Sequence, residues 1–165
     1  MQKHKKKIIA IAVLLLIVLV VFFYFYIPGS RIQGIADLHT ATLVQVRRST
    51  TTQIFAEDGM LLDHEFSHAE YELNPEQIEM LQAFILGNSF TRSTRSVITT
   101  PFPPSGILNR YDIWINFSDG TGPARQLFIN IGGGGYFLID QFNNSWIRIN
   151  NRDWDEEILQ ILALS

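Results

Sequence analysis

Two histidines and a glutamate form the one segment of this sequence whose residue types and spacing could perform chemistry. The stretch LLDHEFSHAEYE, residues 61–72, contains His64, Glu65 and His68 in the pattern H-E-x-x-H. On a helix, residues four positions apart share a face, so both imidazoles can bind one zinc ion while the glutamate polarises a bound water. The pattern therefore raises the hypothesis of a zinc metallopeptidase, with His64 and His68 as metal ligands and Glu65 as the catalytic residue.

This chemistry requires residues 60–73 to be helical, and the neighbouring residues predict a strand instead. Asp58-Gly59 between two apolar stretches is a strong hairpin signal, because the turn needs the positive φ angles that these residues tolerate. On a strand, His64 and His68 would stand about 13 Å apart and could not bind one metal ion. A third histidine with the extended peptidase spacing is also absent. We therefore expect no metal and no catalytic residue here, and keep the zinc site as the alternative.

The same segment is strongly acidic. Residues 57–79 contain eight acids and no Lys or Arg; the acids are Glu57, Asp58, Asp63, Glu65, Glu70, Glu72, Glu76 and Glu79. Such a surface could attract a cation or a basic partner. The plainer expectation is a solvated acidic face, partly balanced by arginines elsewhere, namely Arg92, Arg95 and Arg110. We take Asp63, Glu65, Glu70 and Glu72 as candidate partner-binding residues.

Two aromatic residues form a second candidate surface. Tyr111 to Phe117 alternates, so that Ile113 and Ile115 point to one face of a strand while Trp114 points to the other. Phe128 occupies a similar position on the next expected strand. Trp114 and Phe128 could form an exposed platform for a ligand or partner. Alternatively, one of the two expected helices covers them.

The elements that position these residues predict an α+β fold. We expect an antiparallel sheet of about six or seven strands, with two helices packed on one face. The first helix has Asn74 as N-cap, Pro75 at its first position and Gln77 completing a capping box. Asp153, with Glu156 three residues later, predicts the second helix in the same way. The expected strands cover Asp37 to Arg48, Thr50 to Ala56, Met60 onward, Phe90 to Thr100, and 111–117, 127–131, 136–140 and 146–150.

The N-terminus predicts a membrane anchor. Ile8 to Ile27 is a run of 20 residues without a charge, and a helix of that length spans a hydrocarbon core of about 30 Å. Tyr24 and Tyr26 lie near its far end, where aromatic residues meet the membrane interface. We therefore divide the chain into a basic tail (residues 1–7), a transmembrane anchor (8–27), a tether (28–36) and an extracytoplasmic domain (37–165).

The lysines predict the orientation. All four precede the apolar run, at positions 3, 5, 6 and 7, which keeps the N-terminus in the cytoplasm and places the domain outside the cell membrane. A cleaved signal peptide is the alternative, but its apolar region would be about 7–15 residues long. The absence of Cys fits a bacterial cell surface better than a eukaryotic secretory product.

Charge excludes one class of partner. Residues 28–165 contain nine arginines and 16 acids, a net charge of 9 − 16 = −7. Nucleic-acid binding needs a basic footprint, which this part of the chain lacks. The preferred interpretation is a single-pass, non-enzymatic binding module that recognises an envelope protein or a small ligand; the alternative is the anchored zinc metallopeptidase.

Overall fold

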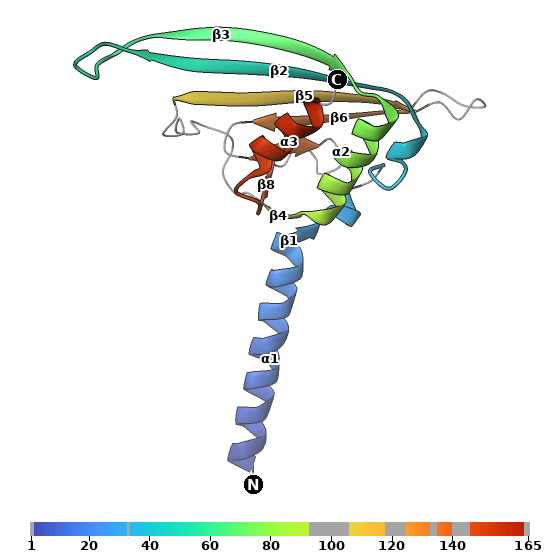
Figure 1. Ribbon diagram of the computed structural model, residues 1–165. Helices are drawn as coiled ribbons and strands as arrows, with labels where there is room; N and C mark the ends of the chain where they lie inside the picture. The colour runs from blue at the N-terminus through green and yellow to red at the C-terminus, as the bar shows by residue number, and fades with distance from the viewer. Residues whose placement is uncertain are drawn as a thin grey trace.

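The computed structural model describes residues 2–32, 34–92, 106–117, 125–132, 135–139 and 146–163. It shows a long N-terminal helix that leads into a domain built from one sheet and two shorter helices (Figure 1). The prediction of an α+β fold with an antiparallel sheet is confirmed. The expected strand within 93–100 and the proline-rich loop at 101–104 lie outside the described residues.

Helix α1 covers Gln2–Phe25 and ends two residues before the expected limit of the anchor. The next three residues form strand β1, Tyr26–Pro28, which pairs antiparallel with β4, Ser89–Arg92. Ile27, expected in the membrane helix, is only 3% exposed and belongs to the core of the domain. Sequence periodicity missed this boundary because Tyr and Ile prolong an apolar run and also favour a strand.

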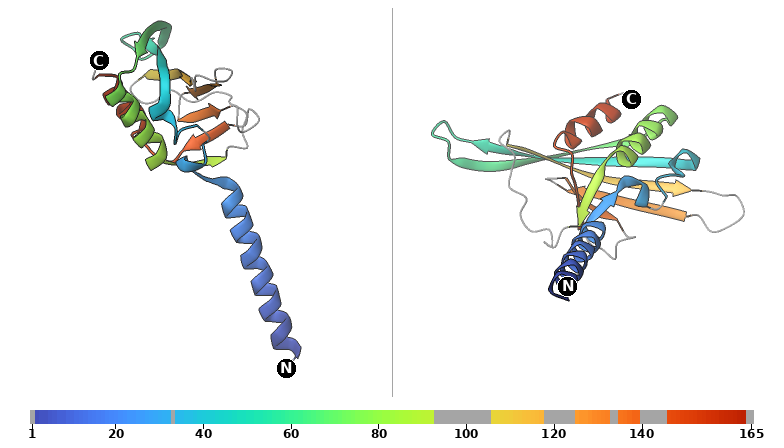
Figure 2. Two further views of the ribbon diagram at one scale, coloured as in Figure 1. Left: turned by 90° about the vertical axis from the view of Figure 1, so that its right-hand side faces the viewer. Right: turned by 90° about the horizontal axis from the view of Figure 1, so that it is seen from below.

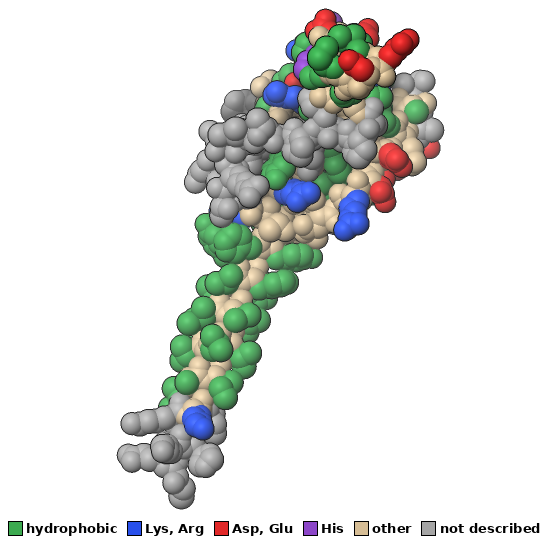
Figure 3. All heavy atoms as spheres, turned by 90° about the vertical axis from the view of Figure 1, so that its left-hand side faces the viewer, with side chains coloured by type: hydrophobic (Ala, Val, Ile, Leu, Met, Phe, Trp, Pro, Cys, Tyr) green, Lys and Arg blue, Asp and Glu red, His purple; other side chains and the backbone are tan. Residues whose placement is uncertain are grey.

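Between Ile9 and Tyr24 the large apolar side chains of α1 are exposed around the helix, from 49% for Val13 to 62% for Ile9, and Lys7 is exposed at its N-terminal end (Figure 3). Among the residues that the structure describes, no helix combines the length and the apolarity needed to cross a membrane, so the predicted transmembrane span is not supported.

The segment after β1, where a free tether is expected, packs on the domain. It forms two short 3-10 helices, η1 (Gly29–Arg31) and η2 (Leu38–Thr40). Ile32 and Ile35 are 2% and 0% exposed and contribute to the same core as the sheet. The segment does not form a separate tether because Ile32, Ile35 and Leu38 are all buried, and burial of these apolar side chains stabilises its packing on the domain.

Within the described residues, the sheet has eight antiparallel strands in the order β1-β4-β8-β7-β6-β5-β2-β3. Besides β1 and β4, its strands are β2 (Ala41–Phe55), β3 (Leu61–Glu72), β5 (Ile107–Phe117), β6 (Arg125–Gly132), β7 (Tyr136–Ile139) and β8 (Trp146–Ile149). The two strands expected at 37–48 and 50–56 are one continuous strand, since the β-branched run through Thr50 prolongs β2 without a turn.

Strands β2 and β3 form a long hairpin around Asp58-Gly59, as predicted. The β2–β5 ladder ends at Thr52 and Ile107, whereas the β2–β3 ladder continues to Phe55 and Leu61. The end of the hairpin therefore projects beyond the rest of the sheet, as Figure 1 shows. We call this projecting part, residues 53–64, the arm.

Helices α2 (Pro75–Gly87) and α3 (Trp154–Leu162) lie together on one face of the sheet (Figure 2). The capping box of α2 is present as predicted: Asn74 accepts from the Gln77 backbone, and the Gln77 side chain accepts from the Asn74 backbone. Gln77 also donates to the Ile161 carbonyl, which joins the two helices. The capping box expected for α3 is wrong, because Asp153 makes no side-chain cap hydrogen bond.

The core lies between the helices and the sheet. Along β5, the side chains of Tyr111, Ile113, Ile115 and Phe117 are buried, while those between them are less so. This alternation follows from the two-residue period of a strand. We call the helix-covered side the inner face of the sheet and the opposite side the outer face.

Candidate functional site

The H-E-x-x-H segment lies entirely on strand β3. His68 is paired with Ser49 and His64 with Gln53, so both histidines point to one face of the strand, about 13 Å apart. Glu65 lies between them in sequence and therefore points to the opposite face. The geometry that a zinc peptidase requires is absent, because the two ligands and the general base do not converge.

A wider search for metal sites gives the same result within the described part of the chain. No group of three or more His, Cys, Asp or Glu side chains there is close enough to hold a metal ion. His64 instead stacks on Phe66, with ring centroids 6.4 Å apart. Its backbone N–H donates to the Asp63 carboxylate at 2.7 Å.

The aromatic pair predicted from the alternation is present on the outer face. Trp114 and Phe128 are directly paired across β5 and β6, with ring centroids 5.6 Å apart. Both side chains are partly exposed. Helices α2 and α3 pack on the inner face (Figure 2), so neither of these helices covers the pair.

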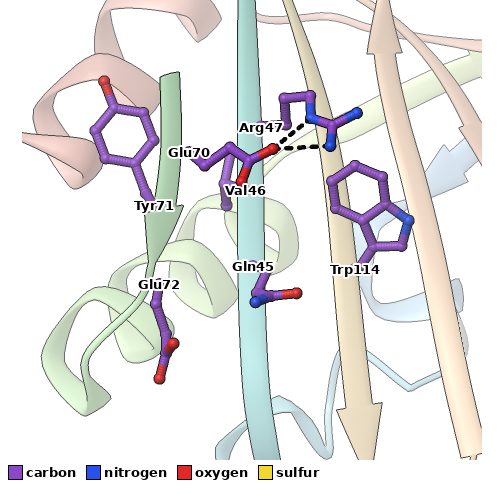
Figure 4. A pocket seen from close by; sticks show the side chains of 7 residues that line it. All are labelled: Gln45, Val46, Arg47, Glu70, Tyr71, Glu72 and Trp114. Atoms are coloured by element: carbon purple, nitrogen blue, oxygen red, sulfur yellow. Dashed lines mark hydrogen bonds and ion pairs between the residues drawn. The ribbon is translucent and has the colours of Figure 1, made fainter. Parts of the chain in front are cut away.

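A hollow of about 440 Å³ lies beside Trp114, where β5, β2 and β3 run next to one another. Its lining residues are Gln45, Val46, Arg47, Glu70, Tyr71, Glu72 and Trp114. Figure 4 shows Trp114, Arg47 and Glu70 side by side across the three strands. The hollow therefore joins the two surfaces that the sequence suggested separately: the aromatic pair and part of the acidic segment.

Arg47 determines the electrostatics of this hollow. Its guanidinium carbon lies 5.3 Å from the centroid of the Trp114 ring, and its Nη2 is 2.8 Å from Glu70 Oε1. The Arg47 Nε also donates to Glu70 at 2.9 Å. An aromatic face and a carboxylate thus hold a planar cation between them, an arrangement that stabilises positive charge.

The partner of Glu70 differs from the arginines that the sequence suggested. Glu70 pairs with Arg47, whereas Arg110 lies 3.9 Å from Asp112 and Arg92 stacks on Tyr24 at 4.7 Å. Arg95 lies outside the described residues. Arg47 could have been found from the turn itself. In a hairpin centred on Asp58-Gly59, paired residue numbers sum to 117, which places Arg47 opposite Glu70.

The remaining acids predicted as candidates separate into two groups. Glu70 and Glu72 line the hollow on the outer face. Asp63 and Glu65 are exposed but alternate with the outer-face residues of β3, so they point to the other face. Of the residues proposed as membrane contacts, Tyr26 is 37% exposed in β1, and the side chain of Ile8 lies outside the described part.

A second polar cluster lies on the inner face and was missed by the sequence analysis. The Tyr111 hydroxyl donates to Asp155 Oδ1 at 2.5 Å, and Asn109 Nδ2 donates to Asp155 Oδ2 at 2.8 Å. Asn109 Oδ1 in turn accepts from Arg48 and Thr50. Burial, followed by the hydrogen bond to Asp155, raises the pKa of Tyr111 above its ordinary value. The cluster fastens α3 to the sheet and does not open into the hollow.

Comparisons of the chain with known proteins add no functional assignment. No protein-family model matches it, no curated protein matches it, and no solved structure matches it. The function must therefore be argued from the residues and geometry of the chain itself.

Proposed function

We propose that this protein is a single-pass, membrane-anchored binding module whose extracytoplasmic domain recognises a cationic group at the outer face of its sheet. The observation that carries the proposal is Arg47 in the hollow, held between the Trp114 ring and the Glu70 carboxylate. This contact within the chain supports a preference of the hollow for planar cations. An incoming ammonium or guanidinium group can occupy the same environment, with Glu72 beside it.

The charge of the domain supports a cationic partner. Residues 28–165 carry nine arginines against 16 acids, and two of the acids of β3, Glu70 and Glu72, line the hollow. A net negative surface speeds the encounter with a positively charged protein segment or small ligand. We therefore propose an envelope protein or a small cationic ligand as the partner.

A peptide titration tests this site. Tetralysine amide, added to the full chain in detergent micelles, should bind with an affinity that falls when NaCl rises from about 50 mM to about 300 mM. Trp114→Leu should weaken binding about tenfold, because it removes the aromatic face. Glu79→Gln is the matched control: it removes one exposed acid of the same segment from α2, outside the hollow. Equal binding by the Trp114→Leu and Glu79→Gln proteins would contradict the proposal.

The proposed anchor rests on the sequence of α1 from Ile8 to Phe25, which contains no charged residue and is preceded by four lysines. The chain has no Cys, so single introduced cysteines report its topology cleanly. In intact bacterial cells, Glu79→Cys should react with a membrane-impermeant maleimide, whereas Gln2→Cys should react only after permeabilisation. The protein should also stay in the membrane pellet after alkaline carbonate extraction. Recovery in the carbonate supernatant, or the reverse labelling, would overturn the anchor.

A further inference from the structure

Within the part of the chain that the structure describes, β3 is an edge strand of the sheet, at the end of the strand order opposite β1 and α1. The sheet begins at β1, directly after α1, and ends at β3, which among the described strands pairs only with β2. Edge strands in natural proteins are usually short or covered, since their unpaired backbone groups invite another strand. Strand β3 has 12 residues, and all except His64 and Tyr71 are exposed.

The register of the hairpin identifies which backbone groups face this edge. The Leu73 N–H donates to the Val44 carbonyl, so the odd-numbered residues of β3 direct their N–H and C=O groups toward β2. The even-numbered residues direct theirs away from the sheet. Phe66, His68, Glu70 and Glu72 therefore present alternating donors and acceptors to an incoming strand.

The side chains of these same four residues point to the outer face, toward the side of the hollow. Phe66 has the highest exposed fraction of the described large apolar side chains, 76%. In Figure 3 the end of the β2–β3 hairpin faces the viewer at the top of the molecule, and hydrophobic and acidic side chains lie next to each other there. An added strand would thus meet an apolar side chain at one end and two carboxylates at the other.

We infer that β3 binds an extended basic segment of a partner protein as a ninth, antiparallel strand of the sheet. This inference rests on the proposed function, because Glu70 and Glu72 belong both to the edge and to the hollow. When a strand is added to a sheet edge, main-chain hydrogen bonds provide affinity for any extended segment. The alternate side chains provide the specificity for a particular sequence. When the partner segment is aligned antiparallel to β3, its basic residues lie opposite Glu72 and Glu70, and an apolar residue lies opposite Phe66.

Charge decides between a partner protein and a second copy of this chain. Strand β3 carries four acids, Asp63, Glu65, Glu70 and Glu72, and no Lys or Arg. Pairing two β3 strands antiparallel would place two such acidic strands beside each other, and like charges across a ladder are destabilising. A basic segment makes favourable pairs at the same positions.

The probe that tests the inference is the capped peptide Lys-Val-Lys-Val-Thr-Val-Phe. Aligned antiparallel, its Lys, Lys, Thr and Phe stand opposite Glu72, Glu70, His68 and Phe66, in hydrogen-bonded pairs. The N–H groups of these residues point to β3, and those of the valines point away. N-methylation of the second Lys and the Thr should therefore weaken binding at least about tenfold. N-methylation of two valines, the matched control, should change it less than about threefold.

Hydrogen exchange on the full chain in detergent micelles locates the bound peptide. The amides of Phe66, His68, Glu70 and Glu72 should become protected when the unmethylated peptide binds. The variant His68→Pro, which removes one outward N–H, should also weaken binding, while His68→Ala, which keeps that N–H, should not. If the proline variant does not fold, the methylated peptides still decide the question.

Three results would overturn the inference. Equal binding of both methylated peptides would leave recognition through the side chains of the hollow, so the proposed function would stand and strand addition would fail. Binding of neither the parent peptide nor tetralysine amide would reject both. Protection of these four amides in the protein alone, with dimers at higher concentration, would make a second copy the occupant.

Discussion

Replacing Gly29 with Ala should lower the free energy of unfolding of the domain by about 3 kcal/mol. A Cβ atom at this position would lie 1.8 Å from the Ile85 carbonyl oxygen and 2.8 Å from the Ile85 carbonyl carbon. Both are backbone atoms of α2, so no side-chain rotation can relieve the clash. Gly29 also donates its N–H to the Asn88 carbonyl at 2.9 Å, and that contact would be displaced too.

The matched control is Gly87→Ala, at the last residue of α2. A Cβ atom there meets nothing within 4 Å, and alanine has the higher helix propensity, so stability should change by less than about 1 kcal/mol. Urea unfolding of the full chain in detergent, followed by tryptophan fluorescence, measures both variants. Similar midpoints for the two would show that the segment after β1 does not pack closely on α2.

Stability should also fall steeply at alkaline pH, and Tyr111 should be the cause. In the unfolded chain this tyrosine titrates with its ordinary pKa of 10.0, whereas in the folded chain burial and Asp155 raise the pKa. Above pH 10 the unfolded state therefore releases a proton that the folded state keeps. The contribution of Tyr111 is complete below that pH and decreases by about 1.4 kcal/mol per pH unit above it.

Between about pH 10 and pH 12 the expected loss is about 2 kcal/mol. Tyr111→Phe should remove this pH dependence, although it is less stable than the parent at neutral pH because Asp155 loses a hydrogen-bond donor. Tyr136→Phe, which leaves Tyr111 in place, is the control and should retain the slope. Residues 28–165 contain no Lys, so lysine titration does not contribute to the alkaline loss within the domain. An unchanged alkaline loss in Tyr111→Phe would refute the assignment.

Local signals predicted the hairpin and the first helix of the domain. Asp58-Gly59 placed residues 61–72 on a strand, and this alone separated His64 from His68 and turned Glu65 to the opposite face. Asn74 and Gln77 predicted the start of α2 together with its capping box. These features depend on residues within a few positions of one another, which is why a sequence pattern can show them.

The parts that sequence analysis missed depend on contacts between distant residues. Strand β1 exists because Ile27 lies opposite Phe90, and the segment after it is ordered by packing on α2 and the core. Asp155 was expected only as a residue of the last helix, but it accepts hydrogen bonds from Tyr111 and Asn109 on β5. Of the proposed binding surface, the sequence suggested Trp114, Phe128 and Glu70, but not Arg47, which lies between Trp114 and Glu70.

The direct passage from α1 into β1 has a mechanical consequence. The chain enters the domain at one edge of the sheet, and the proposed partner binds at the other, so tension between them acts across the strands. Such a load opens ladders one pair at a time. The first ladder it meets from the α1 side, β1 with β4, has only three residue pairs, whereas β2 with β3 has 11. Under tension, β1 should therefore detach from β4 first. The segment that connects α1 to the rest of the domain would then become longer while the partner stays bound to β3.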